Sequence, residues 1–153
     1  MTVDRRGLLV AGLAMTAGCT PAPVARPPST ANAEGRPRRV VSLNPCLDVI
    51  LVQVADRDQI AALSHYARED YGSTIAPLAR TLPFTYETAE EVIALRPDLV
   101  LTGRHSSLAT RNALDRLKIP AALFGVPDTV AESLAQVRQV AAAVGHPERG
   151  EAL

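Results

Sequence analysis

The alternation of apolar patterns between residues 38 and 153 constrains the fold of this chain most strongly. Short β-branched apolar runs alternate with segments whose apolar residues recur every three or four positions. The first pattern is typical of buried strands and the second of amphipathic helices. Strands that alternate with helices through short connections predict a parallel sheet with helices on both faces. The expected fold class is therefore α/β, a Rossmann-like sheet in one domain.

The boundaries of the expected elements follow from turn and capping signals. Thr88 with Glu91, and Thr129 with Glu132, form capping boxes in which the hydroxyl and the carboxylate each satisfy a free backbone N–H. Leucines at 108, 114 and 117 mark one face of a helix, and His146 follows the last helix, where it would meet the helix dipole. We expect strands at residues 40–43, 60–64, 98–102 and 121–124, and helices at 45–54, 88–95, 108–117 and 129–144, with room for one short helix within 65–87.

The first 37 residues indicate export. Arg5 and Arg6 precede a short apolar run that ends in small residues before Cys19, which resembles a twin-arginine signal with a lipobox. The apolar run is shorter than the roughly 20 residues that span a bilayer. Residues 20–37 hold five of the twelve prolines and predict an extended tether. We expect residues 1–19 to be a signal peptide, with lipidation at Cys19 and a periplasmic, membrane-anchored product; a plain cleaved signal is the alternative.

Charge and motifs exclude several function classes. The 16 basic and 16 acidic residues balance, which gives no support for nucleic-acid binding. The sequence lacks a nucleophile elbow, a phosphate-binding loop and a dinucleotide fingerprint, so we expect no enzyme and no cofactor. Glu90 and Glu91 are adjacent on a helix and point about 100° apart, which is unsuited to an acid/base pair.

Candidate ligand residues follow the expected strands. In parallel sheets ligands collect at the carboxyl ends of the strands, and four of the five aromatic residues lie between positions 66 and 86, after the second strand. They form either an exposed stacking surface or a satellite core. His65, His105 and Cys46 also follow strand ends and offer metal-ligating atoms, although no ligand spacing supports a metal site.

Polar side chains occupy the same edge of the expected sheet. Arg104 with Ser106 and Ser107 offers a clamp for a carboxylate or phosphate, and a solvated loop arginine is the simpler reading. Asn44 and Cys46, at the start of the first helix, present backbone donors that ordinary capping would also explain.

Two segments stand out, RVVSLNPC at residues 39–46 and EEVIALRPDLV at residues 90–100. They resemble the periplasmic substrate-binding proteins that deliver vitamin B12, iron-siderophores or haem to ABC importers, and the resemblance covers residues 38–153. It implies a two-lobed fold with ligand in the cleft between the lobes, no catalysis, and docking on the permease through Glu90. The ligand-facing loops of the family correspond to those that hold Asn44, Cys46, His65, Tyr66, Phe84, Tyr86, Arg104 and His105.

The expected function is capture of an iron or cobalt chelate and its delivery to an ABC permease. The sequence reaches only the start of the helix that links the lobes in the family, so we expect the N-terminal lobe alone. The alternatives are a single-lobe α/β module that binds a protein partner, a non-functional truncated product, and a metal-dependent enzyme that uses His65, His105 and Cys46.

Overall fold

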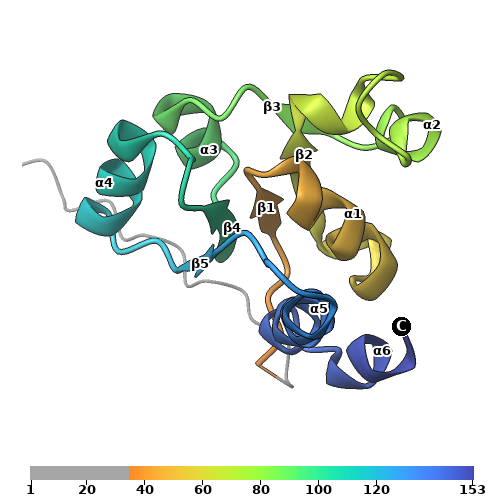
Figure 1. The fold of residues 1–153 in the computed structure, drawn as a ribbon. Helices are drawn as coiled ribbons and strands as arrows, with labels where there is room; N and C mark the ends of the chain where they lie inside the picture. The colour runs from red at the N-terminus through yellow and green to blue at the C-terminus, as the bar shows by residue number, and fades with distance from the viewer. Residues whose placement is uncertain (1–34) are drawn as a thin grey trace, which may run out of the picture.

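A parallel five-stranded sheet organises the chain, with strand order β3-β2-β1-β4-β5 (Figure 1). The computed structural model describes residues 35–153, so the expected signal, most of the tether and Cys19 lie outside the described residues. The strands are β1 (Val40–Ser42), β2 (Ile60–Ser64), β3 (Phe84–Thr85), β4 (Leu99–Gly103) and β5 (Ala121–Phe124). The helices are α1 (Pro45–Val54), α2 (Ala76–Ala79), α3 (Ala89–Ala94), α4 (Leu108–Arg116), α5 (Val130–Ala143) and α6 (Pro147–Ala152), with short 3-10 turns at Arg57–Gln59 and His65–Arg68. The predicted α/β class is confirmed.

Two apolar cores lie on opposite faces of the sheet. On one face Val40, Leu99 and Leu101 pack with α1 and α5, and on the other Val41 and Val100 pack with α3 and α4. Successive strand residues alternate between the two cores, as the period of two in a strand requires. Figure 1 shows the same layering, with α1 and α5 on one side of the sheet and α3 and α4 on the other. Because every pair of neighbouring strands is parallel, the carboxyl ends of all five strands meet at one edge of the sheet.

The two capping boxes form in a modified way. Thr88 Oγ1 accepts a hydrogen bond from Glu91 N at 3.3 Å, as predicted, but Glu91 Oε2 accepts from Tyr86 N at 2.7 Å, two residues before the cap. Glu132 Oε2 likewise reaches Asp128 N at 2.7 Å, one residue before its cap. The carboxylates thus fix the chain that enters each helix and do not accept from the cap residue's own N–H.

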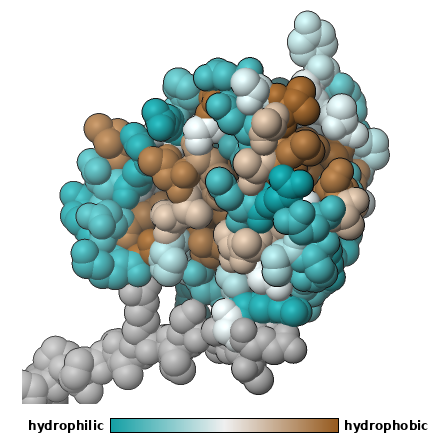
Figure 2. Space-filling view, turned by 60° about the horizontal axis from the view of Figure 1, so that its bottom comes forward, coloured by the Kyte–Doolittle hydropathy of each residue, from teal (hydrophilic) through white to brown (hydrophobic). Residues whose placement is uncertain are grey.

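Some residues expected in the core are exposed. Of the three leucines expected to mark one face of this helix, only Leu114 is buried, whereas Leu108 is 63% and Leu117 42% exposed. Apolar side chains also remain exposed on the edge strand β5 and in the first part of α5, at Leu123 and Leu134. Figure 2, a view of one face, shows apolar patches broken up by hydrophilic residues. Within residues 35–153, no helix combines the length and the apolar character needed to cross a membrane.

A close helix pair ends the described chain. Gly145, with φ 86°, ends α5, and α6 folds back against α5. A Cβ atom on Gly150 would lie 2.6 Å from the Ala141 Cβ atom and 3.0 Å from the Arg138 Cα atom, so the absence of a side chain allows this approach.

Candidate functional site

An open pocket of about 340 Å³ lies at the carboxyl ends of β2 and β3. Its walls come from β3 and from the segments that follow β2 and β3, because a parallel sheet brings the ends of neighbouring strands to the same edge. Its lining residues are His65, Arg68, Glu69, Arg80, Phe84 and Tyr86. Three of the expected ligand residues, His65, Phe84 and Tyr86, are therefore brought together.

The aromatic residues of this segment form an exposed surface. The ring centroids of Phe84 and Tyr86 are 5.4 Å apart in an edge-to-face arrangement, and the His65 ring lies 5.1 Å from Tyr86 and 3.8 Å from Tyr66. Tyr86 is 62% exposed, so these rings do not form a satellite core. Tyr71 is fully exposed and does not line the pocket. The pocket thus offers aromatic faces and edges to a partly apolar ligand.

Two arginines that the sequence analysis missed complete the pocket. The Arg68 guanidinium lies 4.2 Å from the centre of the Phe84 ring, and its Nε atom is buried without a hydrogen-bond partner among residues 35–153. Arg80 donates to the Arg68 carbonyl at 3.1 Å and pairs with Asp70 at 2.6 Å. The apolar residues of this segment show no regular spacing, so the positions of these two arginines could not be predicted from the sequence. The one sequence feature that could have indicated them is that they lie close in sequence to the aromatic residues.

The remaining expected ligand residues lie outside this pocket. Asn44 Oδ1 accepts hydrogen bonds from the backbone N–H groups of Cys46 at 2.9 Å and Leu47 at 3.2 Å, so those donors cap α1 and are already occupied. Gly103 packs on the Asn44 side chain, which brings the loops after β1 and β4 together at the point where the strand order reverses.

The other side chains of these two loops reach solvent. Arg104, His105 and Cys46 are all exposed. Within residues 35–153, no three His, Cys, Asp or Glu side chains are grouped so that they could hold a metal ion. His65, His105 and Cys46 therefore do not form the cluster that the metal-dependent enzyme would need. Glu90 is exposed on α3, as expected.

Two carboxyl groups, buried Asp48 and half-buried Glu87, have raised pKa values. Asp48 of α1 is fully buried, accepts from Ser64 Oγ at 2.5 Å and from Ser64 N at 3.3 Å, and so fixes the residue before His65. Burial raises the Asp48 pKa to about 7, against the opposing effect of hydrogen bonds from Ser42 and Ser64. Burial also raises the pKa of Glu87, whose charge acts on Asp48. Neither group was predicted from the sequence as a site residue.

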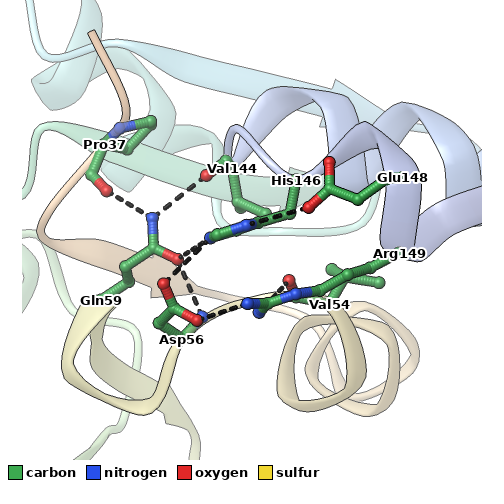
Figure 3. A network of polar contacts seen from close by, with 8 residues as sticks. All are labelled: Pro37, Val54, Asp56, Gln59, Val144, His146, Glu148 and Arg149. Atoms are coloured by element: carbon green, nitrogen blue, oxygen red, sulfur yellow. Dashed lines mark hydrogen bonds and ion pairs between the residues drawn. The ribbon is translucent and has the colours of Figure 1, made fainter. Parts of the chain in front are cut away.

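A second polar network lies at the opposite edge of the sheet (Figure 3). Gln59 Nε2 donates to the carbonyls of Pro37 at 2.7 Å and Val144 at 3.1 Å, and Gln59 Oε1 accepts from Asp56 N at 2.8 Å. His146 is 2% exposed, and its Nε2 atom lies 2.9 Å from Gln59 Oε1. Because that oxygen is an acceptor, His146 Nε2 carries the hydrogen. His146 directly follows the end of α5, and its ring also makes buried side-chain contacts.

Ion pairs close this network around α6. Arg149 donates to the Val54 carbonyl at 3.0 Å and to Asp56 Oδ1 at 2.6 Å, and His146 lies between Asp56 at 3.2 Å and Glu148 at 3.5 Å. The hydrogen bond from Arg149 lowers the Asp56 pKa. The network joins the starts of β1 and β2 to the end of α5 and to α6.

Comparisons with known structures place this fold among periplasmic binding proteins. A periplasmic haem-binding protein from Pseudomonas aeruginosa is 20% identical, with a TM-score of 0.63 over 76% of this chain and 41% of that one. RhuT, a periplasmic haem-binding protein from Roseiflexus sp. RS-1, is 24% identical, with a TM-score of 0.62 over 75% of this chain and 44% of that one. The vitamin B12-binding protein BtuF of Vibrio cholerae is 20% identical, with a TM-score of 0.54 over 76% and 45%. These likenesses show the fold.

The family follows from the sequence match. The periplasmic binding protein family matches residues 40–153, which is most of the chain. No curated protein sequence matches significantly. The chain belongs to the periplasmic binding protein family, a family of solute-binding proteins, and spans less than half the length of the solved structures above.

Proposed function

We propose that this chain captures an iron or cobalt chelate, such as a siderophore, haem or cobalamin, for delivery to an ABC permease. The observation that supports this most is the pocket after β2 and β3, where exposed aromatic rings stand beside cationic side chains. Ligand sites of this kind combine apolar contact area with a few polar groups. The solved structures that share the fold include haem-binding and vitamin B12-binding proteins.

The proposed mechanism is capture without a chemical step. The chelate lies against Phe84 and Tyr86, and Arg68 supplies charge at the pocket wall. A ligand wider than the pocket extends along the sheet edge towards Arg104 and His105, which stand exposed after β4. Since pockets that bind tightly bury 70–90% of a ligand, this open pocket alone gives modest affinity.

Delivery to the permease is proposed to use Glu90. Its carboxylate is exposed on α3, the helix that follows β3, and points to solvent. Charge reversal by Glu90→Arg should reduce cross-linking to the permease complex in membranes and leave chelate affinity unchanged. Equal cross-linking of the wild-type protein and the Glu90→Arg variant would show that Glu90 is not part of the docking surface.

Attachment to the membrane is proposed to use Cys19. A multiply acylated cysteine holds a protein at a bilayer, since each buried CH₂ contributes about 0.8 kcal/mol. Cys19→Ala should release the protein from the membrane fraction into the periplasmic extract. A wild-type protein that is already found in the soluble extract would favour the plain cleaved signal.

A titration with a matched pair of variants tests the ligand site. Haemin, cyanocobalamin and a ferric hydroxamate siderophore are added separately to the full chain, with visible absorbance and tyrosine fluorescence as readouts. The chain has three tyrosines and no tryptophan, so the fluorescence reports on the region of interest. We expect binding of at least one probe at micromolar concentration.

The variants Tyr86→Ala and Tyr71→Ala locate the binding. Tyr86 lines the pocket and Tyr71 does not, although both are exposed tyrosines of the same segment. We expect Tyr86→Ala to lower the affinity about tenfold, which is about 1.4 kcal/mol, and Tyr71→Ala to have no effect. Equal effects would contradict the pocket as the site, and no binding of any probe would favour the protein-interaction module.

A further inference from the structure

The two arginines of the pocket lining differ in their contacts. Arg80 pairs with Asp70 at 2.6 Å and donates a hydrogen bond to the Arg68 carbonyl at 3.1 Å. Arg80 therefore fixes the backbone of the turn that carries Arg68. Within residues 35–153, the guanidinium of Arg68 itself forms neither an ion pair nor a hydrogen bond, and its contact is with the Phe84 ring. Arg68 is thus a pocket-lining cation whose charge no described acidic residue neutralises.

The contact with Phe84 holds this cation beside the aromatic surface of the pocket. The guanidinium lies 4.2 Å from the centre of the Phe84 ring, a distance typical of a cation–π contact. Phe84 in turn meets Tyr86 edge to face, with the ring centroids 5.4 Å apart. Arg68 is half-buried and its Nε atom is buried, so a ligand can reach only the outer part of the guanidinium. An unpaired charge therefore borders the rings that a ligand would cover.

A half-buried guanidinium in such a place needs an acceptor. It carries five N–H donors in one plane and binds the oxygens of a carboxylate through parallel hydrogen bonds. Donors that have lost water and found no acceptor cost stability, and an aromatic ring is not a conventional acceptor. Glu69 also lines the pocket, but its side chain is exposed, so water and salt screen its charge. The bound ligand is the source of acceptor that remains.

We propose that Arg68 makes the pocket selective for anionic chelates, because it binds an anionic oxygen group of the chelate while an apolar face covers Phe84 and Tyr86. This inference rests on the proposed function of the pocket. Carboxylates and ionised catechol hydroxyls supply the same chemistry. A neutral chelate would take water from the guanidinium without pairing its charge, and it should bind more weakly. The pocket is open and holds about 340 Å³, enough for the anionic group and the adjoining part of a chelate.

Pairs of probes that differ in charge test this inference. Haemin has free carboxylates, and its dimethyl ester presents the same macrocycle without them. A ferric tricatecholate is an anion, whereas a ferric trihydroxamate is neutral. Each probe is titrated into the full chain, with visible absorbance and tyrosine fluorescence as readouts. We expect the wild-type chain to bind the anionic member of at least one pair about tenfold or more tightly than the neutral member.

A matched pair of arginine variants assigns the preference to one side chain. Arg68→Met removes the charge and keeps an unbranched side chain over Phe84, so it should reduce the preference about tenfold and leave affinity for the neutral probe near that of the wild type. Arg116→Gln removes an exposed arginine in the last turn of α4, outside the pocket lining, and is the control. We expect it to leave the preference unchanged. Circular dichroism checks that each variant is folded.

Each contrary result has a distinct meaning. An unchanged preference in folded Arg68→Met, or an equal loss in Arg116→Gln, overturns the role of Arg68. A wild-type chain that binds the neutral member of each pair as tightly as the anionic member, or that binds cyanocobalamin alone, overturns this inference while the proposed function stands. This comparison needs no variant, so it decides the question even if Arg68→Met fails to fold. Failure of the wild-type chain to bind any of these probes overturns the proposed function as well.

Discussion

The amino ends of the strands form one edge of the sheet, the amino edge, and their carboxyl ends form the other, the carboxyl edge. Each edge holds a cluster of polar side chains, and the two clusters differ in how fully their hydrogen bonds are satisfied. At the amino edge, Gln59 uses both amide hydrogens and its oxygen, and the buried His146 ring has polar partners on both sides. At the carboxyl edge, His65, Arg68 and Glu87 each have a buried polar atom that finds no hydrogen-bond partner in the described part of the chain, residues 35–153. A satisfied buried network fixes one structure, whereas unsatisfied polar groups are the usual sign of a site that has another function.

This difference predicts that side chains at the amino edge mainly stabilise the fold, whereas side chains at the carboxyl edge mainly bind the ligand. The amino edge joins β1, β2, α5 and α6, and changes there should lower the free energy of unfolding with little effect on ligand affinity. Changes at the carboxyl edge should alter ligand affinity and pH dependence. The predictions below test this separation, from the largest expected effect to the smallest.

Asp48→Asn should change the pH dependence of stability most. The carboxyl group has a pKa of about 7 in the folded chain and about 3.8 when unfolded, so its contribution is fully present below about pH 4 and is lost as the pH rises through 7. The difference between wild type and variant should change by up to about 4 kcal/mol over this range. Urea unfolding at pH 4 to 8, followed by circular dichroism, measures it, and a constant difference would contradict the account.

His146→Ala should destabilise the chain by about 2–4 kcal/mol, because it removes a buried side chain together with its contacts to Gln59 Oε1 and Asp56. Denaturant midpoints give the change. Chelate affinity of the folded variant should equal that of the wild type. A change below about 0.5 kcal/mol, which is typical of an exposed site, would show that the amino-edge network does not stabilise the fold.

Gly150→Ala should lower stability by about 1–3 kcal/mol, since the added methyl group meets α5 at close range. Gly72→Ala is the matched control, because a Cβ atom there has nothing within 4 Å. We expect the control to be neutral or slightly stabilising in thermal unfolding. Equal melting temperatures for the two variants would mean that α6 does not pack closely on α5.

Arg149→Met should have the smallest effect, about 1 kcal/mol or less, because its ion pair with Asp56 is partly exposed. The lowered Asp56 pKa means that the pair stabilises the fold above the usual titration range of an aspartate, and that this contribution is lost as the pH falls. Wild type and variant should therefore converge in urea midpoint at acidic pH. Divergence at acidic pH would contradict this assignment.

The order of the elements could be predicted from the sequence, and the finer packing could not. Apolar periodicity located α1, where Leu47, Leu51 and Val54 are buried as expected. The same reasoning placed Leu108 in the core, where it is not found. Periodicity shows that apolar residues share one face of a helix, but it does not show how much of that face the sheet covers. The segment 65–87 folds through turns and tertiary contacts, so its lining arginines had no periodic signal.

The site was predicted in part for a similar reason. Strand ends and aromatic clustering predicted His65, Phe84 and Tyr86 as ligand residues, and these three line one pocket. Arg68 gave no signal because its position depends on the short 3-10 turn that carries it and on contact with Phe84, which belongs to another strand. His146 was placed at a helix terminus, and its buried contacts with Gln59 depend on pairing between segments 87 residues apart.

Amide hydrogen exchange tests the central claim most directly. The full chain is compared with and without cyanocobalamin, and with and without haemin, at concentrations that saturate binding. For a bound probe we expect slowed exchange in peptides that cover residues 64–69 and 84–88, and no change in peptides that cover residues 56–59 and 144–149. Slowed exchange at the amino edge, with none at the pocket, would contradict the assignment of the carboxyl edge as the ligand site.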